Sequence, residues 1–470
     1  MDFSVPVPRA VGRTGSGSGK GSPGGEPCPS RHALGATADV LRRVRPARRT
    51  AEHGVAVHVY AMPTRRDNVR RMDGPAPHVP ARSRWGVVLA LGTSQTLAWA
   101  SSYYLPAILA DPIAASLGIA RTWVFGAFSM SLLICAVLAP RVGRFIDRRG
   151  GRGVLTLSAI VLSGGLLALA AARGPVVLFA AWAVLGAGMA LGLYDAAFAT
   201  LTTIYTDEAR GPITGITLIA GFASTLSWPV SSVLDHAIGW RGTCVVWAAL
   251  NLVVSLPLIR VVLPAPTRLA HLPRASNARV GWNPRREMIL LAYVYAATWF
   301  VTGSMVAHLP RLLERAGATT TQAIAAAALM GPAQVGARIA EFVLLRRAHP
   351  LVSARIAATL HPLGAAALGL AGTAAIAPFT ILYGAGNGLL TIARGTVPLA
   401  VFGPVGYGER TGLLGAPARA IQSLAPFVFG LLVELLGVSA LFVSAGLCIS
   451  ALVALGFVHP TPAQQRTSGP

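Results

Sequence analysis

The sequence predicts an all-helical membrane protein with twelve transmembrane helices in two homologous six-helix bundles. Three observations support this prediction. Apolar stretches of about 20 residues recur twelve times between Trp85 and Val458, only 12% of the chain is charged while 53% is hydrophobic, and segments of the first half recur in the second. A helix of about 20 residues crosses the hydrocarbon core of a bilayer and satisfies its own backbone hydrogen bonds there.

The expected helices follow one another with short connections, apart from one longer linker at the centre. They define an N-terminal bundle (85–263), a basic linker (264–286), a C-terminal bundle (287–459) and a short tail (460–470). The twelve expected helices cover residues 85–109, 122–140, 153–172, 175–201, 213–233, 241–263, 287–309, 321–345, 351–374, 377–402, 411–436 and 438–459.

The formal net charge of +23 is explained by membrane topology and does not require a nucleic-acid partner. If the N-terminus lies in the cytoplasm, the inner loops contain fourteen arginines and the outer loops contain five. This excess of basic residues in cytoplasmic loops is the usual asymmetry of membrane proteins, and it predicts that both termini are cytoplasmic. One lysine, Lys20, among 40 basic residues is the bias expected of a GC-rich bacterial genome, so the expected location is a bacterial inner membrane.

Residues 1–84 differ from the rest of the chain because they are rich in Gly, Ser, Pro and Arg and contain no apolar segment of a signal peptide. We expect either a disordered cytoplasmic tail or, if the true start is Met62 or Met72, translated upstream sequence. A third interpretation is an arm that binds anionic lipid through an arginine cluster. This cluster comprises Arg42, Arg43, Arg45, Arg48 and Arg49.

An internal repeat relates the two expected bundles, with an offset of about 200 residues. Parallel repeats of this kind, related about the membrane normal, place a substrate site at their interface near the middle of the bilayer. We therefore expect a central cavity between the bundles. The matching pairs are Leu105-Pro106 and Leu309-Pro310, Gly186/Gly188 and Gly384/Gly386, and Arg210/Gly215 and Arg410/Gly415.

A motif between the second and third expected helices resembles one of a known family. Residues 143–152 read Gly-Arg-Phe-Ile-Asp-Arg-Arg-Gly-Gly-Arg. They are similar to the Gly-x-x-x-Asp-Arg/Lys-x-Gly motif of the major facilitator superfamily, which two basic residues follow; the first of these is Gly151 here. With the twelve helices and the two halves, the resemblance covers residues 85–459. The matching residues, called the loop motif below, are Gly143, Asp147, Arg148, Gly150 and Arg152.

The chemistry of the loop motif is suited to a contact between the two halves. Gly143 and Gly150 allow close helix approach and a tight turn. The Asp147 carboxylate can bind the N-terminus of a neighbouring helix. The resemblance implies that this loop joins the halves on the cytoplasmic side and acts as a conformational latch for the outward-open state. The alternative is that its arginines only determine topology.

Two motifs of a particular group within this superfamily are missing. Its proton-driven drug antiporters carry an arginine early in the fourth helix and a paired Gly-Pro element in the fifth. The fourth expected helix contains no arginine, and the fifth has Gly215, Gly221 and Trp228-Pro229 without the paired element. Efflux of cationic drugs is therefore the second hypothesis.

Charged residues inside the expected helices are the main functional candidates, because a charge at the bilayer centre costs about 2.5–3.5 kcal/mol on insertion scales. Gln334, Arg338 and Glu341 share one face of the eighth helix. We expect Gln334 and Arg338 to contact substrate and Glu341 to be a candidate for proton coupling. A structural pair between Arg338 and Glu341 is the alternative.

The fourth and tenth helices supply further candidates. Arg394 shares a helix face with Asn387, and both are expected to bind substrate together with Tyr194. Asp195 is the one acid inside the helices of the first half and a second candidate for proton coupling. Alternatively, Asp195 neutralises loop arginines such as Arg148.

Aromatic residues occupy matching helices of the two halves, and of these Tyr103 is expected to contact substrate. The aromatic set comprises Trp99, Tyr103, Tyr104, Tyr293, Tyr295 and Trp299. Arg419 and Glu434 are expected nearer to helix ends, where a long side chain reaches the interface, and are assigned structural roles. His308 and His361 are isolated histidines, for which interfacial or core positions are favoured over a proton relay.

No catalytic or nucleotide-binding pattern is present: the chain has no GxxxxGK[ST], no HExxH and no nucleophile elbow. The cysteines are isolated, so neither a disulfide framework nor a zinc site is predicted. We therefore expect a protein that is not an enzyme, uses no cofactor or metal and is driven by a gradient.

The sequence predicts a secondary active transporter, symporter or antiporter, that moves a small anionic or carboxylate-bearing metabolite by alternating access. Arg338 and Arg394 favour a carboxylate because guanidinium binds it with two parallel hydrogen bonds. The expected partners are this solute, the lipid bilayer and protons as the candidate coupling ion; nucleic acid is not among them, and a monomer is expected. The alternatives are proton-coupled multidrug efflux and a non-transporting membrane sensor on a transporter scaffold.

Overall fold

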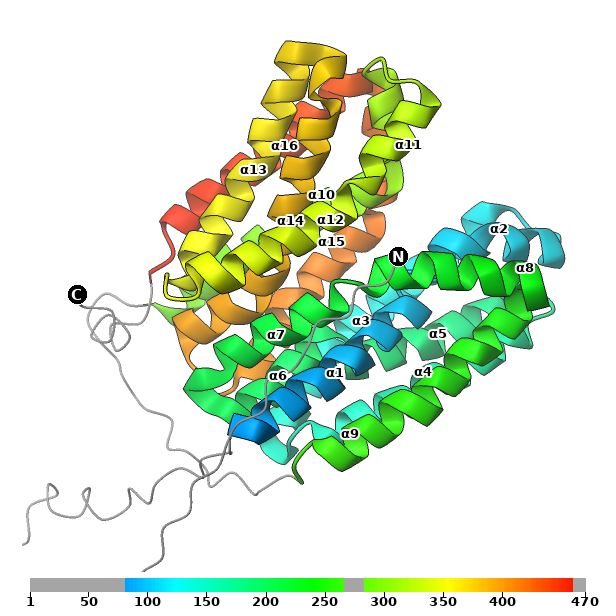
Figure 1. Ribbon diagram of the computed structural model, residues 1–470, viewed down its shortest axis with the longest axis vertical. Coiled ribbons are helices and arrows are strands. Elements are labelled where there is room, and N and C mark those ends of the chain that lie inside the picture. The colour runs from blue at the N-terminus through cyan, green and yellow to red at the C-terminus, as the bar shows by residue number, and fades with distance from the viewer. Residues whose placement is uncertain (1–80, 266–282, 460–470) are drawn as a thin grey trace, which may run out of the picture. The chain divides into compact units, whose positions relative to one another are not determined.

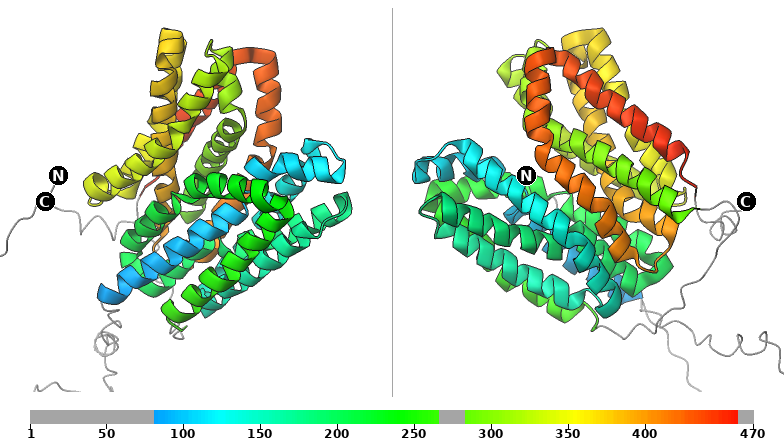
Figure 2. Two further views of the ribbon diagram at one scale, coloured as in Figure 1. Left: turned by 45° about the vertical axis from the view of Figure 1, so that its right-hand side comes forward. Right: turned by 180° about the vertical axis from the view of Figure 1, so that it is seen from behind.

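The structure, a computed structural model, describes residues 81–265 and 283–459. The expected N-terminal tail, most of the linker and the C-terminal tail lie outside these residues. Within them, all regular secondary structure is helical. Figures 1 and 2 show two groups of helices, α1–α9 and α10–α16, as the repeat predicts.

The first bundle consists of α1 (Ala81–Ser101), α2 (Pro106–Leu117), α3 (Arg121–Arg149), α4 (Arg152–Ala170), α5 (Pro175–Gly192), α6 (Tyr194–Tyr205), η2 (Thr206–Ala209), α7 (Arg210–Ala220), α8 (Ala223–Leu250), η3 (Asn251–Ser255) and α9 (Leu256–Val262). The second consists of α10 (Pro284–Arg315), α11 (Thr320–Ala328), α12 (Met330–Ala340), η4 (Glu341–Leu345), α13 (Pro350–Ala371), η5 (Gly372–Ala375), α14 (Ile376–Phe402), α15 (Tyr407–Leu436), η6 (Gly437–Ser439) and α16 (Ala440–Gly456).

Seven helical stretches of the described chain are long and apolar enough to cross a membrane. Three of them far exceed the roughly 20 residues that one crossing needs. Pro175–Val262 has 88 residues, Pro350–Phe402 has 53 and Tyr407–Gly456 has 50. Each contains more than one expected helix, so the seven stretches together hold eleven of the twelve expected helices. The first expected helix, which α1 and α2 share, is not among them, and the count of twelve stays a prediction.

Several expected helices are interrupted where the sequence predicted continuous ones. The first breaks between α1 and α2, where Pro106 begins α2 because proline fits the first helical turn. The fourth breaks at Leu193, whose backbone is extended (φ −76°, ψ −175°) between α5 and α6. The eighth is interrupted at Leu329, between α11 and α12. Inside a membrane protein, such breaks are tolerated where they face protein or a cavity.

Glycines that repeat in the sequence also repeat in the packing. A Cβ atom on Gly186 of α5 would lie 2.5 Å from a carbonyl oxygen of α3, and one on Gly384 of α14 would lie 2.8 Å from a carbonyl oxygen of α12. Gly188 and Gly386 face α4 and α13 at comparably short distances. Glycine is required at these positions because it lets helix backbones approach closely.

Each bundle has its own apolar core, and further apolar side chains point outwards. Trp182 in the first bundle and Phe379 in the second are fully buried. By contrast, Leu370 is 90% exposed and Phe427 is 86% exposed. A soluble protein rarely exposes so many large apolar side chains, so this outer surface is suited to lipid.

The two bundles contact each other mainly through α3 and α6 with α15 and through α7 with α12 and α14. We call the end at which α3 finishes and α15 begins the proximal end, and the opposite end the distal end. The α3–α15 contact is close because Gly412 of α15 lies directly against Ala139: a Cβ on Gly412 would be 2.6 Å from the Ala139 carbonyl oxygen.

Candidate functional site

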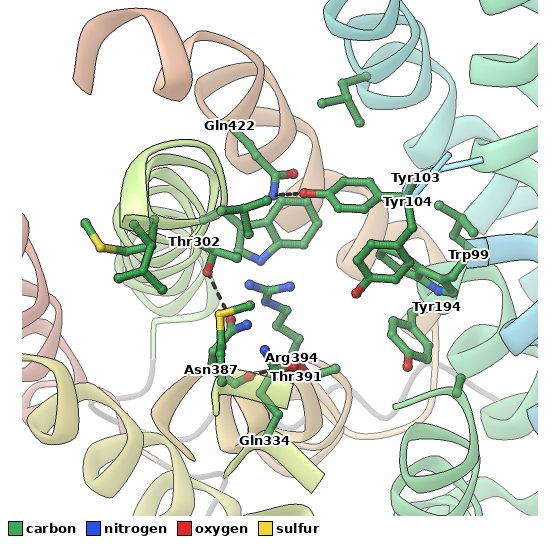
Figure 3. A pocket seen from close by; sticks show the side chains of 18 of the residues that line it. Trp99, Tyr103, Tyr104, Tyr194, Thr302, Gln334, Asn387, Thr391, Arg394 and Gln422 are labelled. Atoms are coloured by element: carbon green, nitrogen blue, oxygen red, sulfur yellow. Dashed lines mark hydrogen bonds between the residues drawn. The ribbon is translucent and has the colours of Figure 1, made fainter. Parts of the chain in front are cut away.

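A cavity of about 450 Å³ lies between the two bundles. Its lining comes from both halves and continues along α10 towards the distal end, where Val306 and Pro310 contribute. Figure 3 shows many of the side chains that line it. All six residues predicted from the sequence as substrate contacts line this cavity: Tyr103, Tyr194, Gln334, Arg338, Asn387 and Arg394.

Breaks in two helices position the aromatic side of the cavity. Tyr103 and Tyr104 lie in the turn between α1 and α2, and Tyr194 begins α6 just after the break at Leu193. Trp99 of α1 contacts all three tyrosines, with ring centroids 5.1, 6.1 and 4.9 Å away. We call Trp99, Tyr103, Tyr104 and Tyr194 the aromatic wall. Their mutual contacts hold the rings in fixed positions.

Arg394 of α14 lies across the cavity from the aromatic wall (Figure 3). Its guanidinium carbon is 4.2 Å from the centroid of the Trp299 ring. Its Nε and Nη2 atoms are buried and have no hydrogen-bond partner among the described residues. Together these atoms form one edge of the guanidinium plane, the kind of edge that binds both oxygens of a carboxylate. Because an unpaired buried donor costs free energy, this edge is suited to a ligand.

Arg419 of α15 corrects one interpretation from the sequence. It lies in the middle of its helix and lines the cavity, whereas the sequence placed it near a helix end. Its Nη2 donates to Oδ2 of Asp195 at 2.5 Å, so Asp195 pairs with an arginine of the other bundle and not with Arg148. The Arg419 guanidinium is also 5.1 Å from the Trp299 ring, which therefore contacts two guanidinium groups.

Arg338 does not form the suggested pair with Glu341. Its Nη1 donates to the Thr217 carbonyl at 3.4 Å, and its Nη2 donates to Gln334 at 3.5 Å and to Thr391 at 3.3 Å. All three acceptors are uncharged. The charge of Arg338 is therefore not balanced by an acid among the described residues.

Two polar contacts complete the lining. Gln422 Nε2 donates to the Tyr103 hydroxyl at 3.0 Å and so joins the second bundle to the aromatic wall (Figure 3). Thr302 Oγ1 donates to Asn387 Oδ1 at 3.1 Å within the second bundle. Both contacts keep amide side chains at the edge of the cavity, where their remaining polar atoms can reach a ligand.

At the proximal end, the loop motif contacts the other bundle. The Asp147 carboxylate accepts hydrogen bonds from the backbone N–H groups of Gly408 and Glu409, each at 2.8 Å, at the beginning of α15. Arg144 donates to the Glu409 carboxylate at 2.6 Å. A Cβ on Gly143 would overlap the Gly408 carbonyl. The aspartate and the first glycine of the motif therefore contact the second bundle directly.

The other residues of the loop motif stay within the first bundle or at its surface. Gly150 ends α3 with φ +77°, a conformation that favours glycine. Arg152 donates to the Arg260 carbonyl of α9. Arg148 is exposed at the end of α3.

A second contact between the halves lies at the same end and was not foreseen from the sequence. Arg210, the first residue of α7, donates to the carbonyl oxygens of Ala348 at 2.5 Å and Leu345 at 2.9 Å, and to Glu341 at 3.2 Å. Glu341 begins the π-helical segment η4 and is 1% exposed. We call the Asp147 and Arg210 interactions together the proximal contacts.

Sequence reasoning missed the roles of Arg419, Trp299, Arg210 and Gln422. One signal was available for two of them, because Arg419 and Gln422 share a face of one helix. The pairing of Arg419 with Asp195 joins residues that are 224 positions apart, and that of Arg210 with Glu341 joins residues 131 apart. Such pairings are not visible in one sequence.

The comparisons with known proteins identify the family of the chain. The family model described as Major Facilitator Superfamily matches residues 91–398. The "Uncharacterized 38 kDa protein in 23S RNA operon" of Thermoproteus tenax is 28% identical over 345 residues, which are 68% of this chain and 88% of that protein.

A second relative is the "MFS-type efflux pump" of Mycolicibacterium smegmatis (strain ATCC 700084 / mc(2)155), which is 29% identical over 235 residues. The match covers 48% of this chain and 53% of the pump, so the chain spans about half of its length. The crystal structure of the human organic anion transporter MFSD10 (TETRAN) superimposes with a TM-score of 0.61 at 17% identity. The superposition covers 80% of this chain and 100% of the MFSD10 chain. At 17% identity, this similarity supports a shared fold alone.

Proposed function

The chain belongs to the major facilitator superfamily of membrane transporters, and from this premise we propose that it moves a small carboxylate-bearing anion by alternating access. The observation that supports an anion is the buried edge of Arg394, whose Nε and Nη2 have no partner among the described residues. A carboxylate supplies two acceptors in the geometry that this edge requires.

The charges around the cavity favour an anion over a cation. Arg338, Arg394 and Arg419 line it, and no Asp or Glu of residues 81–265 or 283–459 does. Asp195 balances only Arg419. A cationic ligand would therefore add to an uncompensated positive charge in a site of low dielectric constant, where repulsion between like charges is strong.

Alternating access is supported by the arrangement of the contacts between the halves. The proximal contacts join the bundles at one end, and the cavity continues towards the distal end along α10. If the proximal end faces the cytoplasm, as the arginine distribution predicts, this is an outward-facing state. Rocking of the two bundles would then break the Asp147 and Arg210 interactions and open the cavity inwards. In this proposal the loop motif is a latch.

Asp195 is the first candidate for proton coupling. Its carboxylate joins α6 of the first bundle to Arg419 of the second at 2.5 Å. Protonation of Asp195 would release Arg419 Nη2 towards an anion, so that a proton and an anion would be moved together. Glu341 is the second candidate, because its protonation would weaken the contact with Arg210 at the proximal end.

Multidrug efflux is the alternative function, and one observation favours it. The relative from Mycolicibacterium smegmatis is named an efflux pump and matches about half of its length. Efflux of cations would require an acid at the cavity, and Asp195 is the acid within reach because it contacts the lining residue Arg419.

The experiment that tests the anion proposal is thermal stabilisation of the detergent-purified protein by a panel of carboxylates, amino acids, sugars and cationic drugs at two pH values. A ligand that binds only the folded state raises the melting temperature. We expect stabilisation by carboxylates that disappears in Arg394→Gln and persists in Arg121→Gln, a control at an exposed arginine paired with Asp111. Stabilisation by cationic drugs alone would favour efflux instead.

A further inference from the structure

The cavity has two chemically different sides, and their combination restricts the ligand further than charge alone. One side presents the guanidinium groups of Arg394 and Arg419, which contact the same Trp299 ring at 4.2 and 5.1 Å. The other side is the aromatic wall (Figure 3). Much of the remaining lining is apolar, including Leu132, Met189 and Met305.

The aromatic wall is fixed in position before any ligand binds. Trp99 contacts Tyr103 edge-on, with ring centroids 5.1 Å apart and an interplanar angle of 62°. Tyr194 stacks on Phe198 at 5.2 Å and 13°. Phe128 supports Tyr103 from behind, at 5.5 Å. Binding of a flat ligand therefore does not need to immobilise these rings, and this lowers the entropic cost of binding.

Each ring of the aromatic wall carries a single polar group. The Tyr103 hydroxyl accepts a hydrogen bond from Gln422, and the Trp99 indole N–H is buried without a hydrogen-bond partner among the described residues. A ligand that carries many hydroxyl groups would find at most one polar group per ring there. A ring that presents its face or edge would lose no hydrogen bonds on entering.

From these observations we propose that the transported anion is an aromatic carboxylate, an arylcarboxylate or a short arylalkanoate. Its carboxylate lies on the Nε/Nη2 edge of Arg394, and its ring lies against the aromatic wall. This inference rests on the proposed function and adds the class of solute. The cavity of about 450 Å³ suits such a ligand, because it falls within the range of about 300–1,000 Å³ common for small-molecule sites.

Other anions fit this arrangement less well. A sugar phosphate or a nucleotide needs polar partners for its hydroxyl groups, whereas the wall consists of aromatic rings. A short aliphatic carboxylate satisfies Arg394 but leaves the wall uncovered. A saturated ring covers the wall but lacks the aromatic quadrupole, which contributes about a two- to tenfold gain in affinity per ring contact.

The test measures dissociation constants of four matched ligands for the purified full-length protein by isothermal titration calorimetry, with thermal stabilisation as a second readout. The ligands are 3-phenylpropionate, 3-cyclohexylpropionate, butyrate and 3-phenylpropanamide. We expect 3-phenylpropionate to bind about five- to tenfold more tightly than its cyclohexyl analogue, butyrate to bind weakly, and the uncharged amide not to bind.

Two tryptophan variants test whether the aromatic wall causes the preference for a phenyl ring. Trp99→Leu should remove the preference for the phenyl ring over the cyclohexyl ring. Trp123→Leu, at a tryptophan on the outer surface that is 52% exposed, should retain it. If Trp99→Leu does not fold, Tyr194→Leu serves in its place, and the comparison of ligands on the unmodified protein needs no variant.

The possible outcomes separate this inference from the proposed function. Equal affinities for the phenyl and cyclohexyl acids, or tighter binding of butyrate, would overturn the aromatic class while an anion site remained. Absence of binding by every carboxylate, together with stabilisation by cationic drugs, would overturn both. Tight binding of the amide would show that the ring alone is recognised, and it would also refute the inference.

Discussion

The interaction of Asp147 with α15 is the part of the proximal contacts that a single substitution can remove most cleanly. Asp147→Ala eliminates two hydrogen bonds of 2.8 Å from the backbone N–H groups of Gly408 and Glu409. A hydrogen bond to a charged group contributes about 1.5–3 kcal/mol. The carboxylate is half-buried and regains water when the halves separate. We therefore assign the two hydrogen bonds together a contribution of about 2 kcal/mol to the closed state.

A loss of about 2 kcal/mol shifts the ratio of proximally closed to proximally open molecules by roughly 30-fold. The shift should be visible as a distance distribution between spin labels. Arg149→Cys and Arg346→Cys place labels on exposed residues of the two bundles at the proximal end. The four native cysteines are replaced first; the three in the described residues are buried.

We expect one short distance in the parent protein and a second, longer distance that grows in Asp147→Ala. The control is Asp111→Ala, which removes an exposed carboxylate paired with Arg121 away from the proximal contacts. It should leave the distribution unchanged. An unchanged distribution in Asp147→Ala as well would refute the claim that this interaction holds the proximal end closed.

Three further predictions concern charged groups. Asp195→Asn leaves Arg419 buried without its partner, which should cost about 3 kcal/mol of stability and lower the melting temperature, and Asp195→Asn combined with Arg419→Gln should recover part of this loss. Arg210→Gln removes the second proximal contact and should enlarge the open population in the spin-label experiment to a similar extent as Asp147→Ala; no change would exclude this contact from the latch. His349 caps α13 by accepting from Leu351 N–H at 3.3 Å, and burial, with Arg210 and Arg355 nearby, lowers its pKa. The folded protein therefore disfavours protonated His349. The contribution of neutral His349 to the stability of the fold is complete above the ordinary histidine pKa of about 6.5 and is lost as pH falls. Melting curves of His349→Asn should lack this loss.

The membrane architecture and six residues of the cavity lining could be predicted from the sequence because both depend on local signals. Long apolar stretches predict helices, and a charge such as Arg394 inside one must face protein or a cavity. The position at the cavity was predicted for Tyr103, Tyr194 and Asn387 because they lie on helices that line the interface between parallel repeats. The glycine repeats, such as Gly186 and Gly384, predicted two related halves, and in the structure both glycines lie close to the backbone of a neighbouring helix.

The pairing of charges could not be predicted, because it depends on contacts between distant helices. Arg338 and Glu341 are three residues apart on one helix, and this spacing suggested that they pair. In the structure, Glu341 binds Arg210 of the other bundle. Asp195 similarly pairs with Arg419, 224 residues later. The break at Leu193 was also missed, because no proline marks it within a long apolar stretch.

The most direct test of the account is transport itself, measured as counterflow of a radiolabelled carboxylate in proteoliposomes. Counterflow requires the site to face both sides in turn, so a membrane sensor that binds without transporting would give no signal. Arg394→Gln should lose about 30-fold or more of the initial rate at subsaturating substrate, because one charge-assisted, two-donor contact is removed, whereas Arg121→Gln should match the unmodified protein. Counterflow at the normal rate in Arg394→Gln would contradict the account.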